Sequence, residues 1–193
     1  LHLLSMRAVT AGTQLVVPRG TAGLVNRLGA AAVHEVVPGD VVTLAGRTGP
    51  VIVRATPAVH SGARGPHSRV RAQPVGYLVE GAGRAVYFAG DTDLFDAMSE
   101  FEGVDLALLP IWGWGPTLGP GHLDPGRAAT ATGLILPGRV VPIHWGTYSP
   151  VRAGRGAPSW LDTPLGTFRN ALADSGLTDR LDVLRPGEHS ALA

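Results

Sequence analysis

The sequence predicts an α/β fold in which helices cover layered sheets, and three observations support this fold class. Short apolar runs separated by turn residues fill the first half of the chain, which is typical of sequential strands. In the second half, apolar runs alternate with segments of helical periodicity. No internal repeat or linker interrupts this order, so one domain over residues 1–193 is expected. The mixture favours sheets covered by helices over a helical bundle or a pure sandwich.

The first half is expected to consist mainly of short strands. The apolar run at 14–17 stops at a proline, and Gly29 ends a helix that Thr21 can cap. Turn residues at 38–40 and 46–50 separate the strands that follow. The expected elements are the end of a helix at 1–9, a strand at 14–17, a helix from Thr21 to Leu28, strands at 33–37, 41–44 and 51–55, and a loop at 61–74.

The second half is expected to alternate strands with helices. Gly81-Ala82-Gly83 joins two alternating runs and predicts a hairpin. A fully apolar run at 104–111 predicts a buried strand. The expected elements are strands at 75–80 and 84–89, a short helix at 93–101, a strand at 104–111, a loop at 112–125, a helix at 126–136, a strand at 139–143, a loop at 147–160, a helix at 164–175 and a last strand at 181–184.

Composition restricts the function classes. The 193-residue chain is 45% hydrophobic and carries a formal net charge of +1, so the sequence gives no electrostatic case for a nucleic acid or an anionic membrane as the main partner. It contains no cysteine, which leaves His and carboxylates as the metal ligands and fits a reducing cytoplasm. No apolar run approaches the roughly 20 residues of a membrane span, and no secretory leader opens the chain.

Three apolar strands end directly in a residue that can bind a metal. His60 follows Val-Ile-Val-Arg-Ala-Thr-Pro-Ala-Val, Asp91 follows Ala-Val-Tyr-Phe-Ala-Gly, and His144 follows Arg-Val-Val-Pro-Ile. Each one alone has an ordinary interpretation, because a His after a strand is often a surface or core residue and Gly-Asp-Thr is often a turn or a helix cap. Three such endings in one chain favour a metal site, since strand ends hold side chains rigidly.

The order of these segments resembles the metallo-β-lactamase superfamily. Within it, the sequence is similar to the branches of N-acyl-phosphatidylethanolamine phospholipase D and ascorbate-6-phosphate lactonase. Pro57-Ala58-Val59-His60 resembles the third family motif, Tyr87-Phe88-Ala89-Gly90-Asp91-Thr92 the fourth, and Pro142-Ile143-His144-Trp145-Gly146-Thr147 the last metal motif. Leu108-Leu109-Pro110-Ile111 with Gly121-His122-Leu123-Asp124-Pro125 resembles a segment of this branch that leads into a helix.

The resemblance implies a four-layer αββα sandwich and a metal-dependent hydrolase. One metal would bind His60, the other would bind His144, and Asp91 would bridge the two metals. A metal-bound hydroxide would then attack an ester, lactone or phosphodiester, with a small or lipid-like molecule as the substrate. Two Zn²⁺ ions suit these ligands, and Mn²⁺ or Fe²⁺ would also be accepted.

The strongest family signature, His-x-His-x-Asp-His, does not occur in the sequence. The segment Leu1-His2-Leu3-Leu4-Ser5-Met6-Arg7 resembles the residues that follow this motif in relatives, so we expect the motif to lie directly upstream and His2 not to be a ligand. Three ligands from two metal positions complete neither shell. The chain alone is therefore expected to bind metal weakly, to catalyse little and to leave a sheet edge unprotected.

Other candidate residues allow two interpretations. His122 either faces the cleft, where it binds substrate or moves a proton, or is a loop His beside a helix cap. Trp112 and Trp114 either form an apolar wall for a substrate or pack over the sheet. The stretch 64–71 contains three Arg residues and His67, and a solvated loop is favoured there over a phosphate site.

Two further functions compete with the hydrolase. A degenerate family member would keep the fold as a binding or interaction module without catalysis. A nuclease-like member would act on nucleic acid, which the near-neutral charge disfavours. The residues encoded upstream of Leu1 separate the first two, because His-x-His-x-Asp-His there would support the enzyme. The sequence does not predict an oligomeric state.

Overall fold

The computed structural model describes residues 12–26, 28–62, 71–113, 116–146 and 161–191. The helix end expected at 1–9 and the loop expected at 147–160 lie outside these residues, as do Trp114 and most of the arginine-rich stretch at 64–71.

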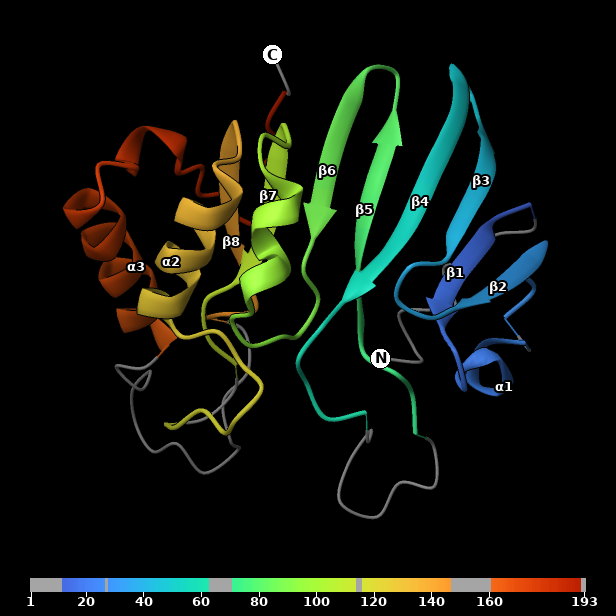
Figure 1. The fold of residues 1–193 in the computed structure, drawn as a ribbon, viewed down its shortest axis with the longest axis horizontal. Coiled ribbons are helices and arrows are strands. Elements are labelled where there is room, and N and C mark those ends of the chain that lie inside the picture. The colour runs from blue at the N-terminus through green and yellow to red at the C-terminus, as the bar shows by residue number, and fades with distance from the viewer. Residues whose placement is uncertain (1–11, 27, 63–70, 114–115, 147–160, 192–193) are drawn as a thin grey trace.

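A six-stranded sheet forms the centre of the molecule, and its strands lie side by side in chain order (Figure 1). The first four strands pair antiparallel, and the last two join in parallel, each after a helical crossover. The turn between the third and fourth strands uses left-handed Ala82 and Gly83, with φ values of 50° and 75°, as predicted for a tight hairpin. The strands are β3 (Val41–Gly46), β4 (Gly49–Pro57), β5 (Val75–Gly81), β6 (Arg84–Phe88), β7 (Leu106–Pro110) and β8 (Arg139–Ile143).

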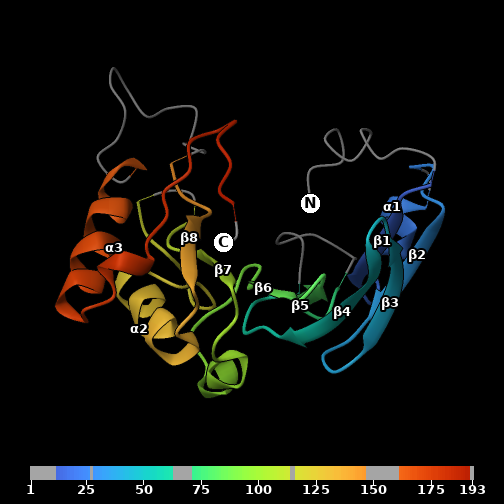
Figure 2. The same cartoon turned by 90° about the horizontal axis from the view of Figure 1, so that it is seen from above.

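Helices cover one face of this sheet beside β6, β7 and β8 (Figures 1 and 2). Asp124 caps the central helix, where its Oδ1 accepts from the Arg127 amide at 2.8 Å, and left-handed Leu136 ends it. The helix expected at 93–101 is instead a 3₁₀-helix that begins only at Asp96, because residues 91–95 are committed to loop hydrogen bonds. The helices are η2 (Asp96–Phe101), α2 (Pro125–Ile135), α3 (Thr163–Asp174) and η4 (Thr178–Arg180).

The main core lies between these helices and the sheet. Strand register puts Tyr87, Ala107 and Val140 on the helix-covered face, and all three are fully buried. Tyr87 stacks on Phe101 of η2, with 4.5 Å between the ring centroids. Apolar burial of this kind supplies most of the stability of such a layered domain.

A second, two-stranded sheet packs on the opposite face of the six-stranded sheet. It consists of β1 (Gln14–Pro18) and β2 (Ala32–Val36), which pair in parallel around the short helix α1 (Ala22–Val25). Val16 and Val36 of this sheet pack against Ala55, Val75 and Tyr77. The expected α/β layering is thereby confirmed, but β2 pairs with β1 and not in hairpin series with β3.

The N-terminus of α1 is held by Glu35 and not by the expected Thr21 side chain. The Thr21 hydroxyl donates to the Pro18 carbonyl and makes no capping bond. Instead, Glu35 Oε1 accepts from the amides of Gly20 and Ala22 at 2.9 and 2.8 Å. The bond from Ala22 is the largest influence that lowers the pKa of the Glu35 carboxyl. Parallel pairing of β1 and β2 brings this carboxylate to the helix.

The prediction of a last strand at 181–184 is wrong. Leu181 makes an isolated parallel bridge to Val140, and the Asp182 amide donates to the Val140 carbonyl at 2.9 Å. The preceding 3₁₀-turn and the following Pro186 leave no room for a longer ladder.

The second face of the six-stranded sheet is apolar beyond the part that β1 and β2 cover. Register aligns Val86 with Leu106 and Phe88 with Leu108, and none of these four belongs to a buried cluster of the described residues. Phe88 is 39% exposed. No helix in the described part of the chain is long and apolar enough to cross a membrane.

The tyrosines predict how stability depends on alkaline pH. Burial raises the pKa of Tyr77 to about 12 and raises the pKa of Tyr87 further. Between pH 10 and 12 the unfolded chain therefore loses protons that the folded chain keeps, so the free energy of unfolding falls as pH rises, by at most about 1.4 kcal/mol per pH unit for each tyrosine. Because the chain has no Lys and no Cys, few other groups titrate there. Urea unfolding at pH 9–12 should show a shallower fall for Tyr77→Phe, and an unchanged slope would contradict this account.

The exposed apolar face predicts self-association of the 193-residue chain. In sedimentation velocity, the sedimentation coefficient should rise less with protein concentration for Phe88→Ser, because this substitution removes apolar area from this face. Ile52→Ser is the matched control, because Ile52 is similarly exposed, at 36%, but points to the other face of the sheet. Equal behaviour of the two variants would contradict a role for this face.

Candidate metal centre

Asp91 and His144 meet at one edge of the six-stranded sheet. Asp91 follows β6 by three residues and His144 directly follows β8, and these parallel strands flank β7, so their carboxyl ends share an edge. Asp91 Oδ1 lies 3.3 Å from His144 Nε2. The two side chains are 43% and 33% exposed, so both can be reached from solvent.

The backbone of His144 is strained. Its φ of 59° lies in the left-handed region, which a non-glycine residue seldom adopts. Such conformations cost roughly 1–3 kcal/mol and occur mainly where function requires a particular side-chain direction. The strain turns the chain sharply at the end of β8 and directs the imidazole toward Asp91.

His60, which follows β4, contacts His122 from the loop before α2. The two Nε2 atoms lie 3.3 Å apart, and the rings meet edge to face with 4.8 Å between centroids. This approach requires glycine at position 121, where φ is +85° and a Cβ would lie 3.2 Å from the His60 Cα. Gly121 thus allows the two loops to touch.

The hydrogen bonds of His60 and His122 fix their tautomers. Each Nδ1 faces a carbonyl oxygen, that of Ser61 at 2.8 Å and that of Gly119 at 3.3 Å. A carbonyl only accepts, so both Nδ1 atoms carry the proton in the neutral rings. The two Nε2 lone pairs then face each other, an arrangement that a shared cation stabilises. Metal-binding histidines are commonly oriented by such Nδ1 bonds.

Gly113 lies beside one histidine of each pair. A Cβ at this position would lie 3.8 Å from His144 Nε2 and 4.0 Å from the His122 ring. All four predicted site residues therefore lie in two contacting pairs, Asp91 with His144 and His60 with His122.

The donor set fits a divalent metal in kind and in spacing. Two ligand atoms at 2.0–2.1 Å on a tetrahedral Zn²⁺ are separated by about 3.3 Å, which matches both the nitrogen–nitrogen pair of His60 and His122 and the oxygen–nitrogen pair of Asp91 and His144. Within the described ranges, however, no group of three or more His, Asp or Glu residues is close enough to hold an ion. Each pair is thus half of a coordination shell, and the metal-binding role of His60, Asp91 and His144 stays a prediction.

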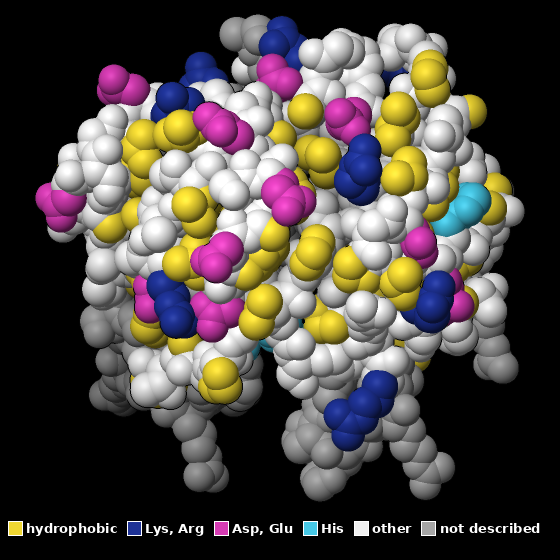
Figure 3. Space-filling model, in the orientation of Figure 1, with side chains coloured by type: hydrophobic (Ala, Val, Ile, Leu, Met, Phe, Trp, Pro, Cys, Tyr) yellow, Lys and Arg dark blue, Asp and Glu magenta, His cyan; other side chains and the backbone are white. Residues whose placement is uncertain are grey.

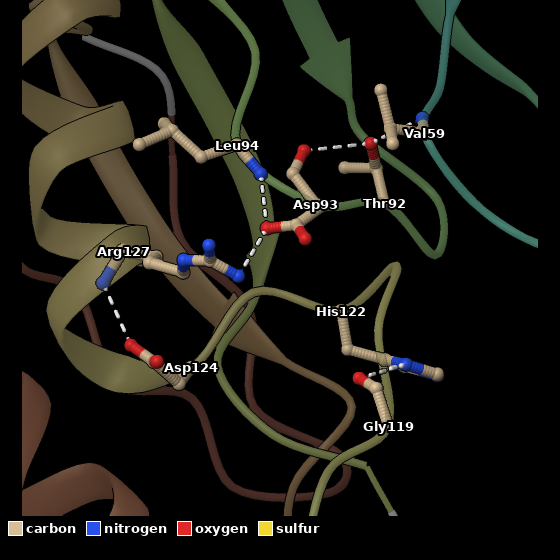
Figure 4. Close-up of polar contacts among 8 residues, drawn as sticks. All are labelled: Val59, Thr92, Asp93, Leu94, Gly119, His122, Asp124 and Arg127. Atoms are coloured by element: carbon tan, nitrogen blue, oxygen red, sulfur yellow. Dashed lines mark hydrogen bonds and ion pairs between the residues drawn. The ribbon is translucent and has the colours of Figure 1, made fainter.

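Thr92 joins the loops that carry the site (Figure 4). Its buried hydroxyl accepts from the Val59 amide at 2.8 Å and donates to the Asp93 carbonyl at 2.9 Å. Its own carbonyl accepts from the Leu123 amide at 2.8 Å, and the Asp93 amide donates to the Val59 carbonyl. The segments beside His60, Asp91 and His122 are therefore fixed to one another.

An ion pair fixes the same region to α2. Arg127 Nη1 donates to Asp93 Oδ1 at 2.7 Å, and the same oxygen accepts from the Leu94 amide (Figure 4). Neither this ion pair nor the joining role of Thr92 is indicated by the sequence pattern. The Gly-Asp-Thr motif indicated a cap, but Phe95 occupies the position before η2. Whether a Thr in this motif caps a helix or joins two loops depends on its hydrogen-bond partner, and the partner of Thr92 is Val59, which is distant in sequence.

The layered α/β fold with His and Asp at strand ends agrees with the metallo-β-lactamase fold that the sequence resembles. The chain belongs to the Beta-lactamase superfamily domain family, whose sequence profile matches residues 1–145.

Named relatives support this assignment. A UPF0173 metal-dependent hydrolase of Thermococcus kodakarensis is 38% identical over 121 residues, which are 58% of this chain and 50% of the relative. One of Desulforamulus reducens is 32% identical over 147 residues, 72% of this chain and 57% of the relative. The chain thus spans about half the length of these curated relatives.

A solved structure agrees with the fold. Igni18, a metallo hydrolase from Ignicoccus hospitalis, superposes with a TM-score of 0.63 at 25% identity, over 91% of this chain and 77% of that one. These comparisons do not single out the N-acyl-phosphatidylethanolamine phospholipase D branch, so the narrower resemblance stays a prediction.

Thr92 gives a test of how the site is held together. Thr92→Val removes the hydroxyl and leaves the Val59 amide without its acceptor, which should lower the free energy of unfolding by about 1–3 kcal/mol and weaken zinc binding. Thr92→Ser keeps the oxygen and should retain zinc affinity. Urea unfolding and zinc titration of both variants check this. Equal zinc affinity for the two variants would show that the hydroxyl does not position the site.

Proposed function

We propose that this chain supplies part of the active site of a metal-dependent hydrolase that acts on an ester, lactone or phosphodiester. The observation that carries the proposal is the two donor contacts, each 3.3 Å long: Asp91 with His144 at the ends of β6 and β8, and His60 after β4 with His122 in the loop before α2. The names of the relatives, metal-dependent hydrolases, support the same activity.

His60, Asp91 and His144 would hold the metal, with zinc as the favoured ion and Mn²⁺ or Fe²⁺ as alternatives. A divalent metal bound there supplies Lewis acidity and brings the pKa of a water molecule toward about 7. The unprotonated Nε2 atoms of His60 and His122 are free to bind a cation or accept a proton. Asp91 directs Oδ1 to His144, which leaves its second oxygen for another partner.

His122 has two candidate roles, and its geometry serves both. Its Nε2 lies at ligand spacing from His60, which suits metal binding. The His122 ring also lies beside Gly113 and close to His144, where it could move a proton to or from a substrate. Zinc affinity and turnover separate the roles: loss of turnover at unchanged affinity for His122→Ala would assign proton transfer, and loss of affinity would assign binding.

Two other functions remain candidates on narrower grounds. A degenerate binding module could also retain two incomplete coordination shells. The presence of His-x-His-x-Asp-His upstream of Leu1 would support the enzyme, and its absence the binding module. A nuclease-like function is disfavoured, because on the face seen in Figure 3 arginine and acidic side chains are interspersed and no broad basic patch gathers.

Zinc titration of the 193-residue chain tests the proposal. The chain should bind zinc weakly, because each pair lacks further ligands, and His60→Ala, Asp91→Asn and His144→Ala should each weaken binding by about 10-fold or more. His34→Ala is the matched control, since His34 bonds to Gln14 in the other sheet. Two tightly held zinc ions would contradict the incomplete shells, and equal affinities for all the variants would contradict the assignment.

Turnover is tested separately on a panel of phosphodiester, lactone and ester substrates with zinc present. A chain extended to the length of its relatives should hydrolyse at least one of these substrate classes. The 193-residue chain should hydrolyse the same class much more slowly. If the extended chain binds zinc through these residues and hydrolyses none of the panel, the hydrolase proposal fails while the metal centre stands.

A further inference from the structure

A pocket of about 700 Å³ opens beside His144, and its lining includes none of His60, Asp91 and His122. It lies between the end of β8, the helix α3 and the C-terminal segment, and Figure 2 shows α3 and this segment flanking β8. Its volume is in the range of sites that bind small organic molecules. His144 is shared between this pocket and the candidate metal centre.

The lining combines apolar walls with two cationic side chains. Leu165 of α3 and the C-terminal residues Val183 and Leu184 supply apolar surface, and Trp145 adds an aromatic ring. Trp145 is fixed there, because its Nε1 donates to the Pro142 carbonyl at 3.1 Å. Trp145 was not among the tryptophans that the sequence suggested for a substrate wall, and of those Trp112 is not among the residues that line this pocket.

The cations are Arg169 of α3 and Arg185 of the C-terminal segment. Neither guanidinium makes a hydrogen bond or ion pair with the described residues, in contrast to Arg84 and Arg127, which pair with carboxylates. No Asp or Glu is among the described residues that line the pocket. Two arginines that line one apolar pocket, without a side-chain partner among the described residues, favour an anionic guest over a neutral or cationic one.

We propose that this pocket binds the anionic group of an amphiphilic substrate, a carboxylate or a phosphate that is joined to an apolar body. Arg169 and Arg185 bind the anion through charge-assisted hydrogen bonds, and Leu165, Trp145 and Val183 contact the apolar part. Because His144 lines the pocket, the bound molecule extends toward the donor pairs. The inference rests on the proposed function only for the statement that this molecule is a substrate.

Anion binding by the metal-free 193-residue chain tests the proposal without any need for turnover. The probes are phenyl phosphate, phenylacetate and the neutral phenylacetamide, titrated by calorimetry at low salt. The two anions should bind saturably and the amide much more weakly, and the stronger anion identifies the phosphate or the carboxylate as the natural group. Arg169→Gln and Arg185→Gln should each weaken anion binding about 10-fold or more.

Arg47→Gln is the matched control, because it removes the same charge from an exposed turn far from the pocket in sequence and should leave anion binding unchanged. Equal weakening by all three substitutions would reduce the effect to net charge and overturn the proposal. Equal binding of the amide and the anions, or no saturable anion binding, would also overturn it. Anion binding through the two arginines together with an inactive zinc-loaded protein would leave the pocket standing and refute only the hydrolase.

Discussion

The arrangement of the candidate site depends on the hydrogen bonds of Thr92. Its hydroxyl and carbonyl bind the amides of Val59 and Leu123, which neighbour His60 and His122 in sequence. Asp91 precedes Thr92 directly, so one buried residue fixes the relative positions of three segments from distant parts of the chain. Loops alone do not hold side chains to the tolerance of a metal site, and a buried bonding centre at a strand end supplies that rigidity.

Sheet topology supplies the remaining alignment. The parallel strands β6, β7 and β8 end at one edge, so Asp91 and His144 approach each other although 53 positions separate them in numbering. The helix-covered face of these strands is dry and closely packed around Tyr87 and Leu109, which makes the edge a rigid platform. The other face stays apolar and partly exposed, as in a sheet whose second covering layer extends over only part of its width.

Local patterns predicted most of the strands and placed His60, Asp91 and His144 just past strand ends, because an apolar run that stops at a polar residue is visible within a few positions of sequence. Pairings between distant segments could not be predicted. The Glu35 carboxylate that caps α1 and the contact of His60 with His122 both depend on such pairings. The 93–101 segment was misassigned as a longer helix for the same reason, since Asp93 bonds to Arg127 34 positions away. Each of these features follows from tertiary contacts and leaves little trace in local composition.

Electrostatics connects the donor pairs with the pocket beside them. The facing lone pairs of His60 and His122, and the Asp91 carboxylate against His144, are arrangements that a bound cation stabilises. A cation there would in turn attract the negatively charged reacting group of a substrate, while Arg169 and Arg185 would hold a second anionic group at a distance from it. A chain with a net charge of only +1 can favour an anionic substrate in this way, because two of its arginines line the pocket that shares His144 with the donor pairs.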